Sequence, residues 1–484
     1  MSNLSKILFD RNKNHSTKTA FVEEHRSITY GELEIYSRCI ASWMAVQQIK
    51  PGDRVGIIYY DKIDSVAVFL STILIGAIPV LISPKGKPNK IQTQLASIDP
   101  KLVCIENGLD ISPIPYRTVT LDQLRINSTN MTPYDDVNIA SETDVATMVF
   151  TSGTTGYSKP VMYTHKRLLL DGQITTVDYL KVTSTDKLFC AAKLYTGFGF
   201  IRVLIGTLYA GASAYLLSDI ASPVELRKIL KNFCPTLFFA APIFYTKLIV
   251  KNQKLTLDCR YYCAGSNLSL QIIEQWKNYT DRNLHNLFGT TECCSAITVN
   301  LDGDSSSIGT PTTAYQLRIV NDNNSPVVDG TVGHLQVKSL LSGVGYFDDP
   351  AWTEKIFKEW IPTGDLCYKD SKQHYYYVGR VNSIVKINGQ FVNLTEIDDV
   401  LSKYAGIEQA ATVATSDENG NDQLEAFIVP HADSDINLLS LKSWMIANYE
   451  KNSCPKRFYI VNDLPTTESG KIEKYKLTSD YTTV

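Results

Sequence analysis

The chain has 484 residues, of which 44% are apolar and 20% are charged, and its net charge is −3 at pH 7. This composition is typical of a soluble globular protein and excludes long disordered stretches, and no run of basic residues is long enough to indicate nucleic-acid binding. The chain is too long for one ordinary core, so we expect two or more domains. The ten cysteines form no C-x-x-C pair and the seven histidines no ligand-spaced cluster, so neither disulfides nor zinc are expected.

No segment of the sequence predicts a membrane protein. The N-terminus lacks the apolar core of a signal peptide. The apolar run at 66–82 is short for a membrane span, and Gly76 and Pro79 interrupt it. We interpret it as a buried helix at 64–75 followed by a buried strand at 79–82, and we expect a cytoplasmic protein.

The first half of the chain alternates between helical and strand patterns. The alternation is clear at 27–82, where a helix opens at Thr29, and it returns at 188–250. Short apolar strands separated by helices are typical of parallel sheets with helices on their faces. The further elements expected in these regions are strands at 54–60, 214–217 and 236–241 and a helix at 222–232.

The pattern changes in the second half. Turn signals become frequent between about 305 and 378, which predicts a small antiparallel subdomain. Beyond residue 380 the α/β pattern resumes, with a hairpin around Asn388-Gly389, a helix at 395–403 and a strand at 409–413. This last part has the size of a separate small domain.

Residues 151–160, Thr-Ser-Gly-Thr-Thr-Gly-Tyr-Ser-Lys-Pro, directly follow a predicted buried strand at 144–150. Glycine permits positive φ and close approach, hydroxyl groups donate to an anion, and the lysine adds positive charge. The segment is not a G-x-x-x-x-G-K-[ST] loop, because Lys159 follows Gly156 by three positions. We predict phosphate binding, with a flexible linker as the alternative, and the candidate residues are Thr151, Ser152, Gly153, Thr154, Thr155, Gly156 and Lys159.

A second candidate segment, residues 286–292, reads Asn-Leu-Phe-Gly-Thr-Thr-Glu. Phe288 is suited to stack on an adenine ring, and Gly289 permits a sharp turn. Thr291 can reach a phosphate, and Glu292 offers a hard oxygen ligand for Mg²⁺. An ordinary capped turn into a helix is an equal alternative on these residues alone. The candidates are Asn286, Phe288, Gly289, Thr290, Thr291 and Glu292.

Three shorter motifs do not indicate a function when each is taken alone. They are Cys-Ala-Gly-Ser at 263–266, Thr-Gly-Asp at 363–365 with Arg380 downstream, and Pro-Thr-Thr-Glu-Ser-Gly-Lys-Ile at 465–472. The Thr-Gly-Asp segment by itself indicates a solvated turn. Their order along the chain, together with the two segments above, is what makes them informative.

These motifs resemble, in order, those of the adenylate-forming enzymes, which include acyl-CoA synthetases, luciferases and the adenylation domains of peptide synthetases. The resemblance runs from Ser27-Ile-Thr-Tyr-Gly-Glu-Leu33 to Lys471 and thus covers essentially the whole chain. It implies an α/β fold with a large N-terminal domain of packed α/β subdomains, which includes a small β-barrel-like subdomain, and a small mobile C-terminal α+β domain. We place these domains at 1–380 and 381–484.

The resemblance also implies roles for individual residues. The loop at 151–160 surrounds the triphosphate of ATP, Asp365 accepts both ribose hydroxyls, and Arg380 makes a second ribose or phosphate contact. Lys471 bridges the substrate carboxylate and the α-phosphate. The further implied residues are Ala264, Gly265 and Ser266 beneath the adenine and the acyl group, Tyr377 at the nucleotide, Lys386 and Gly389 at the thiol tunnel, and Asn382 at the hinge, where aspartate is usual.

Two regions, 193–200 and 239–245, are expected to line the acyl pocket. No acidic residue lies between Lys187 and Ser218, so an ammonium group would stay uncompensated there, and α-amino acids are disfavoured. Ala-Lys-Leu-Tyr-Thr-Gly-Phe-Gly at 192–199 resembles the A-K-L-F-F-A-Y-G stretch of benzoate–CoA ligases, which favours an aryl acid, with aliphatic acids as the alternative. The pocket candidates are Tyr195, Thr196, Gly197, Phe198, Ala240, Phe244, Gly265 and Gly289.

The function expected from the resemblance is an ATP-dependent acid–thiol ligase with Mg²⁺ and coenzyme A. An enzyme that loads an aryl acid onto the phosphopantetheine of an acyl or peptidyl carrier protein is one alternative. A nucleotide-binding regulatory protein without turnover is another. The expected partners are a small carboxylic acid and the thiol acceptor, without nucleic acid or membrane, and the protein is expected to be a monomer or homodimer.

Overall fold

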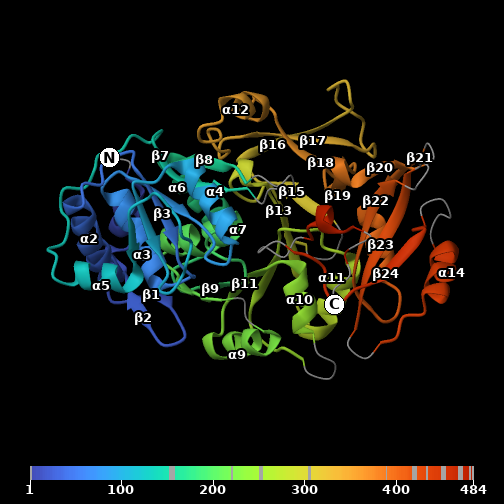
Figure 1. Cartoon of the computed structure of the whole chain (residues 1–484), viewed down its shortest axis with the longest axis horizontal. Helices are drawn as coiled ribbons and strands as arrows, with labels where there is room; N and C mark the ends of the chain where they lie inside the picture. The colour runs from blue at the N-terminus through green and yellow to red at the C-terminus, as the bar shows by residue number, and fades with distance from the viewer. Residues whose placement is uncertain are drawn as a thin grey trace. The chain divides into compact units, whose positions relative to one another are not determined.

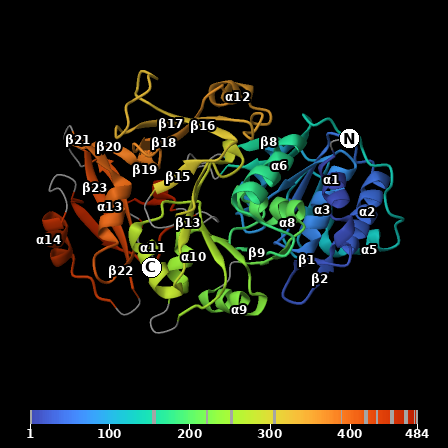
Figure 2. The ribbon, with the colours of Figure 1, turned by 180° about the vertical axis from the view of Figure 1, so that it is seen from behind.

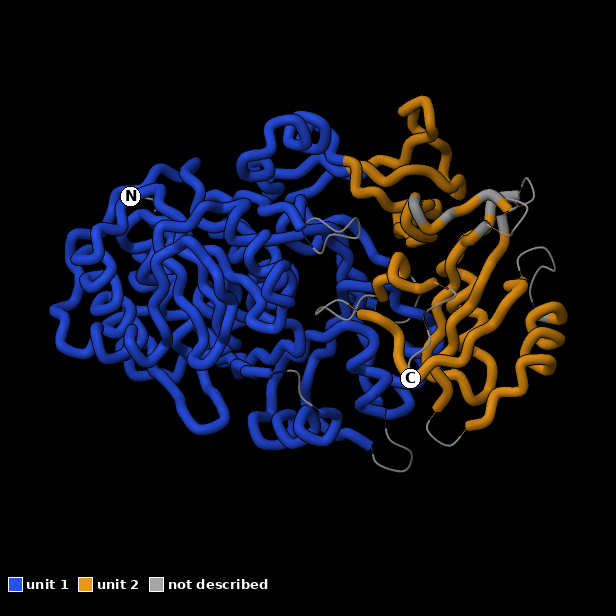
Figure 3. The backbone as a smooth tube through the Cα atoms, viewed as in Figure 1, with its two compact units in different colours: residues 1–317, 337–361 blue, residues 318–336, 362–484 orange. Residues whose placement is uncertain are grey.

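The computed structural model describes residues 3–151, 158–219, 222–249, 254–302, 307–387, 390–416, 422–431, 434–448, 454–466, 472–478 and 481. Its contacts divide the chain into two compact units, shown in two colours in Figure 3: residues 1–317 with 337–361, and residues 318–336 with 362–484. The predicted domain boundary after residue 380 was placed at the expected hinge. It remains a prediction.

The first sheet of unit 1 is parallel at its centre. Its strands follow the order β15-β14-β13-β12-β11-β9-β10-β1-β2. The six neighbouring strands β13, β12, β11, β9, β10 and β1 pair in parallel. The outer strands β2, β14 and β15 pair antiparallel. The predicted strands at 214–217 and 236–241 are thus confirmed. The bounds are β1 (Thr19–Val22), β2 (Ser27–Thr29), β9 (Lys187–Cys190), β10 (Ser213–Tyr215), β11 (Leu237–Ala240), β12 (Arg260–Cys263), β13 (Leu284–Phe288), β14 (Thr298–Asn300) and β15 (Ser307–Pro311).

The second sheet of unit 1 has the order β6-β5-β3-β4-β7-β8. All neighbours pair in parallel except β7 and β8, which form an antiparallel pair on either side of the predicted phosphate loop. The bounds are β3 (Arg54–Ile58), β4 (Ile78–Leu81), β5 (Leu102–Ile105), β6 (Thr118–Thr120), β7 (Val145–Phe150) and β8 (Pro160–Thr164).

Helices cover both sheets of unit 1, and α1, α2, α3 and α5 gather together in the two opposite views of Figures 1 and 2. The predicted opening at Thr29 is a complete capping box: the Thr29 side chain accepts from Glu32 N, and the Glu32 carboxylate accepts from Thr29 N. The bounds are α1 (Leu4–Arg11), α2 (Tyr30–Val46), α3 (Ile63–Leu74), α4 (Pro88–Ile98), α5 (Leu121–Thr129), α6 (His165–Asp171), the π-helix η2 (Gly172–Tyr179), α7 (Gly197–Gly199), the π-helix η3 (Phe200–Ile205), α8 (Gly206–Ala210), α9 (Pro223–Phe233), α10 (Pro242–Leu248), α11 (Leu270–Thr280), the 3₁₀ turn η4 (Thr291–Cys293) and α12 (Pro350–Ile356).

The apolar run at 66–82 is a core element. Every residue of α3 is buried, and α3 leads directly into the buried strand β4. A helix that is apolar on all sides is buried within a protein or a membrane, and the contacts of α3 with α1 and α2 establish the first case. Within the part of the chain that the structure describes, none of the helices has the length and apolar character to cross a membrane.

Unit 2 contains the C-terminal α+β region. The predicted hairpin around residues 388–389 is confirmed by the antiparallel pair β20–β21, although its two turn residues lie outside the described residues. β22 and β23 pair antiparallel, β24 joins β23 in parallel, and α13 packs on β22. The bounds are β18 (Ile361–Lys369), β19 (Tyr375–Arg380), η5 (Val381–Ser383), β20 (Ile384–Ile387), β21 (Gln390–Asn393), α13 (Leu394–Leu401), β22 (Ile407–Ser416), β23 (Asp422–Pro430), α14 (Leu438–Asn448), β24 (Arg457–Ile460) and η7 (Lys474–Lys476).

The turn-rich segment between about 305 and 378 forms neighbouring strands in the order β16-β17-β18-β19, with β18 and β19 antiparallel. β16 (Tyr315–Val320) and β17 (Gly333–Ser339) each span a boundary between the two units. The predicted antiparallel character is confirmed for the pair β18–β19. Among the strands that the structure describes there, the order is that of an open sheet.

A buried histidine anchors the N-terminal helix and gives a pH prediction. His165 is 3% exposed, and its Nδ1 accepts a hydrogen bond from Leu4 N at 3.1 Å. Burial lowers the pKa of His165 from 6.5 to about 4. Because the unfolded chain binds this proton more tightly than the folded protein, the stability contribution is complete above the unfolded pKa and is lost as the pH falls toward the folded one.

We expect the free energy of unfolding to fall by roughly 2.5 kcal/mol between pH 7 and about pH 4.5 on account of this group. His165→Asn keeps an acceptor but cannot be protonated, so it is expected to lose this part of the pH dependence. Urea titrations of both proteins at the two pH values measure the difference. Parallel losses in the two proteins would contradict the prediction.

Candidate active site

The carboxyl ends of four neighbouring parallel strands bring most of the predicted site segments together. Phe239 of β11 lies opposite Cys190 of β9, and Ala240, the last residue of β11, lies opposite Cys263 of β12. Cys263 in turn lies opposite Asn286 of β13. The segments that leave these strands, 191–199, 241–245, 264–266 and 289–292, therefore start from one edge of the sheet. This edge is where open α/β sheets bind ligands.

The two ends of the predicted phosphate loop are tied together. Thr151 N donates to Lys159 O at 2.9 Å, and Lys159 N donates to Thr151 Oγ1 at 3.0 Å. The remaining candidates in this loop, Ser152, Gly153, Thr154, Thr155 and Gly156, lie outside the described residues.

Lys159 has a carboxylate and two aromatic rings as neighbours. Its ammonium forms an ion pair with Asp349. The Nζ atom lies 4.9 Å from the centre of the Trp352 ring and 5.7 Å from that of Tyr346, within the range of cation–π attraction. The hydrogen bond from Lys159 lowers the pKa of Asp349. None of these three neighbours was predicted from the sequence.

Glu292 stands in the 3₁₀ turn after β13. Its Oε1 accepts a hydrogen bond from the Tyr346 hydroxyl at 2.9 Å, and its backbone oxygen accepts one from Gly343 N at 2.8 Å. Thr290 caps the turn by accepting from Cys293 N at 3.3 Å, and the backbone oxygen of Thr291 accepts from the Tyr163 hydroxyl.

The residues before Glu292 fit their predicted positions. A Cβ atom at Gly289 would collide with the carbonyl oxygen of Ser295, so the sharp turn there requires glycine. Asn286 is buried in β13, and Phe288 is partly buried. Ala264 is buried, and Gly265 has φ +96° with no atom within 4 Å of where its Cβ would be. Ser266, on the same loop, is exposed.

The chain reverses immediately after Glu292 through a strained residue. Cys294 has φ +73° and ψ −52°, and Ser295 N donates to Cys293 O at 2.9 Å. This is the rare kind of γ-turn, which costs energy for any residue with a Cβ. The Tyr315 hydroxyl holds the turn by donating to Cys293 O at 2.8 Å. A sequence offers no signal for such a cysteine, because the residue types that favour positive φ are glycine and asparagine.

A buried ion pair connects this turn with the acyl-pocket region. The Arg202 guanidinium of η3 donates to Asp171 Oδ2 at 2.9 Å and to Ser295 Oγ at 2.8 Å. The side chains of Arg202 and Asp171 are 3% and 0% exposed. Removing one partner of such a pair leaves an uncompensated buried charge, so the pair fixes the segment after Gly197 to the turn after Glu292.

The predicted acyl-pocket stretch begins as a capped turn. Thr196 Oγ1 accepts from Gly199 N at 3.3 Å and donates to Lys193 O at 2.7 Å. Gly197 has no atom within 4 Å of where its Cβ would be, so this glycine borders open space. Tyr195 and Phe198 are partly buried against the larger core, and the Phe198 ring meets the edge of Phe239 at 6.0 Å.

Two predicted pocket residues pack in a different core cluster from Tyr195 and Phe198. Ala240 and Phe244 pack with the core cluster that contains Phe238 and Tyr261, whereas Phe239 belongs to the core cluster of Tyr195 and Phe198. Successive strand residues point to opposite faces of a sheet, which explains why Ala240 is separated from Phe239.

A buried carboxylate that the sequence analysis missed supports this stretch. Both carboxylate oxygens of Asp61 accept from Leu194 N at 3.1 Å, and burial raises the pKa of Asp61 to about 7. The Lys193 ammonium is also buried and donates to Leu217 O and Asp219 O, each at 2.6 Å. Lys193 is thus occupied by backbone carbonyls, and Asp61 by the backbone of the acyl stretch.

The predicted ribose site lies within unit 2. Asp365 and Arg380 face each other across β18 and β19, and Arg380 Nε lies 2.8 Å from Asp365 Oδ1. The Asp365 side chain is 1% exposed. Arg380 also donates to Thr363 O at 3.1 Å. Gly364, between Thr363 and Asp365 in the chain, has φ +74°. Burial, with the Asp365 charge, raises the pKa of Tyr377.

The predicted catalytic lysine and thiol-tunnel glycine, Lys471 and Gly389, lie outside the described residues. The side chains of Asn382 and Lys386 do as well. Thr466 and Ile472, which are described on either side of Lys471, form an isolated antiparallel bridge. Lys474, just beyond it, forms an ion pair with Asp398 of α13 at 2.5 Å.

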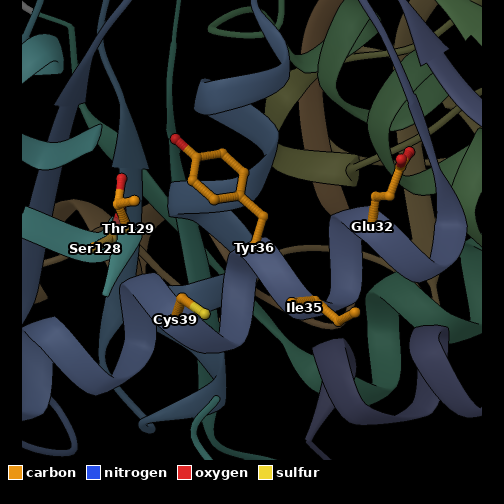
Figure 4. A pocket seen from close by; sticks show the side chains of 6 residues that line it. All are labelled: Glu32, Ile35, Tyr36, Cys39, Ser128 and Thr129. Carbon is orange, nitrogen blue, oxygen red and sulfur yellow. The ribbon is translucent and has the colours of Figure 1, made fainter. Parts of the chain in front are cut away.

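Two surface cavities are away from these residues. One of about 290 Å³ is lined by α2 and α5 residues, among them Tyr36 and Cys39 (Figure 4). The other, of about 330 Å³, is lined by residues 105–118. Neither cavity is lined by a predicted site residue.

Comparison with known proteins identifies the family. Residues 8–347 match the protein family described as "AMP-binding enzyme", and residues 396–471 match the family described as "AMP-binding enzyme C-terminal domain". The 3-hydroxybenzoate–CoA ligase of Aromatoleum sp. (strain CIB) is 26% identical over 95% of this chain and 92% of its own length. The 4-hydroxybenzoate–CoA/benzoate–CoA ligase of Rhodopseudomonas palustris is 27% identical over 97% of this chain and 92% of its own.

Solved structures confirm the predicted fold class. The benzoate CoA ligase from Burkholderia xenovorans LB400 has a TM-score of 0.91 at 23% identity, covering 98% of this chain and 99% of its own. An anthranilate CoA ligase in complex with anthranoyl-AMP has a TM-score of 0.90 at 23% identity, covering 98% and 96%. The two family matches together account for most of the sequence. The chain therefore belongs to the family of AMP-binding enzymes.

Proposed function

We propose that this chain is an AMP-forming aryl acid–CoA ligase that acts in the cytoplasm. It joins an aryl carboxylic acid to AMP with release of pyrophosphate and then transfers the acyl group to coenzyme A. The observation that carries the proposal is the shared edge of β9, β11, β12 and β13, from which the predicted adenine segments, the turn with Glu292 and the predicted acyl segments leave. The reaction requires no membrane, and it is compatible with a monomer or a homodimer.

In the first reaction an oxygen of the acid carboxylate forms a bond to the α-phosphorus of ATP. The bond from that phosphorus to the bridging oxygen breaks, and pyrophosphate leaves with the electron pair. Both reactants are anions, so the reaction needs fixed positive charge at the point of attack. We assign Lys471 to the carboxylate and α-phosphate, Lys159 to the triphosphate, and Asp365 with Arg380 to the ribose.

Glu292 is suited to hold Mg²⁺ together with the nucleotide. Mg²⁺ is usually bound through one or two carboxylates plus substrate phosphates. Glu292 is partly exposed, and one of its carboxylate oxygens is oriented by Tyr346. Among the described residues no three His, Cys, Asp or Glu side chains cluster. When bound, the ion neutralises charge on the phosphates.

In the second reaction the coenzyme A thiolate attacks the acyl carbonyl, the new C–S bond forms, and AMP leaves with the carboxylate oxygen. We propose that the C-terminal domain turns about the hinge at Asn382 and that Gly389 and Lys386 border the thiol tunnel. Coenzyme A is favoured over a carrier protein because the CoA ligase relatives match along 92% of their own length. By contrast, bacitracin synthase 3 of Bacillus licheniformis, 24% identical, is matched over only 8% of its length.

An aryl acid is favoured by the surroundings of the acyl stretch. Phe198, Phe239 and Tyr262 follow one another at ring distances of 6.0 and 5.2 Å, and offset aromatic surfaces suit a flat ring. Relatives named for benzoate and hydroxybenzoates support the same class. Gly197 and Gly265, with open space around both, leave room for it.

The test is a screen of pyrophosphate release with benzoic, hydroxybenzoic, aminobenzoic, cinnamic and aliphatic acids. Each acid is combined with coenzyme A or with a phosphopantetheinylated carrier protein. We expect turnover with an aryl acid and coenzyme A, detected as the acyl-CoA by mass spectrometry. A preference for aliphatic acids would overturn the acid class, and turnover with the carrier protein alone would overturn the acceptor.

Gly197 is expected to control the size of the acid. Gly197→Val adds side-chain volume where the structure has open space, so we expect kcat/KM for the bulkiest accepted acid to fall about tenfold or more relative to benzoate. Gly197→Ala is expected to give a smaller shift in the same direction, with an unchanged melting temperature in both variants. Equal losses for all acids, including short aliphatic ones, would remove Gly197 from the pocket.

A further inference from the structure

A short segment, residues 343–347, connects the two predicted phosphate-binding elements of unit 1. We call these residues the clamp. On one side it runs antiparallel to β8, the strand that begins directly after Lys159: Met162 N donates to Gly345 O at 2.9 Å, and Phe347 N donates to Pro160 O at 2.9 Å. On the other side Gly343 N donates to Glu292 O at 2.8 Å.

Tyr346 is the clamp residue whose side chain reaches both elements. Its hydroxyl donates to Glu292 Oε1 at 2.9 Å. The residue is 6% exposed, and its ring meets the edge of Phe357 at 5.1 Å. Its backbone is held at the same point, because Tyr346 N donates to Thr353 Oγ1 at 2.9 Å. The ring therefore has little freedom to move.

Lys159 lies near the face of the same ring. Its Nζ is 5.7 Å from the ring centre, and its ion-pair partner Asp349 lies three residues beyond Tyr346. Asp349 is fixed in turn, because its Oδ1 accepts from Trp352 N at 3.1 Å and caps α12. One tyrosine thus contacts the carboxylate expected to bind the metal and the ammonium expected to bind phosphate.

We propose, on the basis of the proposed function, that Tyr346 is a positioning residue for the metal–nucleotide. Its hydroxyl orients the Glu292 carboxylate, and its ring holds the Lys159 ammonium near its face. Both charged groups are therefore in position before MgATP binds. Preorganised charges gain affinity because the ordering cost is met before the ligand binds.

The hydroxyl is suited to this role over the whole working pH range. A tyrosine hydroxyl has an ordinary pKa of about 10. It therefore keeps its proton and remains a donor to Glu292 Oε1. A neutral donor orients the carboxylate without neutralising it, so the Glu292 charge stays available for a cation.

The test is Tyr346→Phe, which removes only the hydroxyl. Its probe is α,β-methylene-ATP, titrated calorimetrically with Mg²⁺ and again with EDTA. We expect the dissociation constant of the magnesium complex to rise about tenfold, the effect of losing one hydrogen bond to a charged group. Binding of the metal-free nucleotide is expected to be unchanged, and so is the melting temperature.

Tyr163→Phe is the matched control. Tyr163 is also buried, and its hydroxyl donates in the same turn, but to the backbone oxygen of Thr291. We expect it to leave the magnesium dependence within twofold of the wild type. In a Glu292→Gln background, Tyr346→Phe is expected to have no further effect, because the residue acts through that carboxylate.

The inference is overturned if Tyr346→Phe binds the magnesium complex as tightly as the wild type. It is also overturned if binding weakens equally with and without the metal, since the hydroxyl would then serve the fold. These outcomes are independent of the acid. A wild-type protein that binds the magnesium complex but releases no pyrophosphate with any acid would overturn the proposed function and leave the positioning role standing.

Discussion

Lys471→Ala is expected to reduce acid-dependent pyrophosphate exchange by about a hundredfold or more. A carboxylate and an α-phosphate repel each other, and losing one preorganised charge at a reacting centre costs on the order of 10² to 10³ in rate. Thioester formation from a supplied acyl-adenylate does not require this cation, so we expect that half-reaction to keep most of its rate. Pyrophosphate exchange and AMP release, assayed separately, measure the two steps.

Lys476→Ala is the control for Lys471. It removes one positive charge from the same tail, where Lys476 forms a surface ion pair with Glu473. Both half-reactions are expected to stay near wild-type rates. Gly389→Trp should give the opposite pattern, with exchange retained and thioester formation lost, because bulk at the tunnel obstructs pantetheine. Equal loss of both half-reactions in Lys471→Ala would contradict the assignment.

Asp365→Ala is expected to raise the KM for ATP about a hundredfold or more. The proposed ribose contacts are two hydrogen bonds to a charged acceptor, each contributing roughly 1.5–3 kcal/mol. A sharper consequence concerns the nucleotide. The wild type is expected to discriminate strongly against 2′,3′-dideoxy-ATP, and the variant to use both nucleotides equally poorly. Initial rates with ATP and the dideoxy analogue measure this.

The control for Asp365 is Asp370→Asn, which changes a carboxylate just beyond the end of β18. Asp370 accepts from His374 N at 2.9 Å, and asparagine preserves that acceptor. Its KM for ATP is expected to stay unchanged. Because Asp365 is paired with Arg380, Asp365→Asn is a second variant that keeps the shape of the site. If Asp365→Ala and Asp365→Asn raise the KM for ATP and for the dideoxy analogue by the same factor, Asp365 does not bind the ribose.

Local sequence rules predicted the elements well. The helix that opens at Thr29, the strand β11 and the helix α9 lie where propensity and apolar pattern placed them. The run at 66–82 was assigned to the core because Gly76 and Pro79 divide it. Such signals depend on neighbours along the chain, so they can be read without knowing the fold.

The site was predicted in part. Motif order identified Glu292, Asp365 and Arg380 as candidates, and the structure brings Asp365 and Arg380 together across one strand pair. Ala240 and Phe244 were assigned to the acyl pocket from their position in the chain, but they pack with the core cluster that contains Phe238 and Tyr261. Moving one residue along a strand places the side chain on the opposite face of the sheet, and the apolar run at 237–240 shows no polar alternation to tell the faces apart.

The amino-acid sequence by itself determined the family, the order of the elements and the chemical types at the site, because each depends on short segments. Only the tertiary structure decided which distant groups meet. Tyr346 contacts Glu292 across 54 positions, and Lys159 pairs with Asp349 across 190. The sequence around Tyr346 and around Asp349 contains no motif that indicates these contacts, because they form only when the chain is folded.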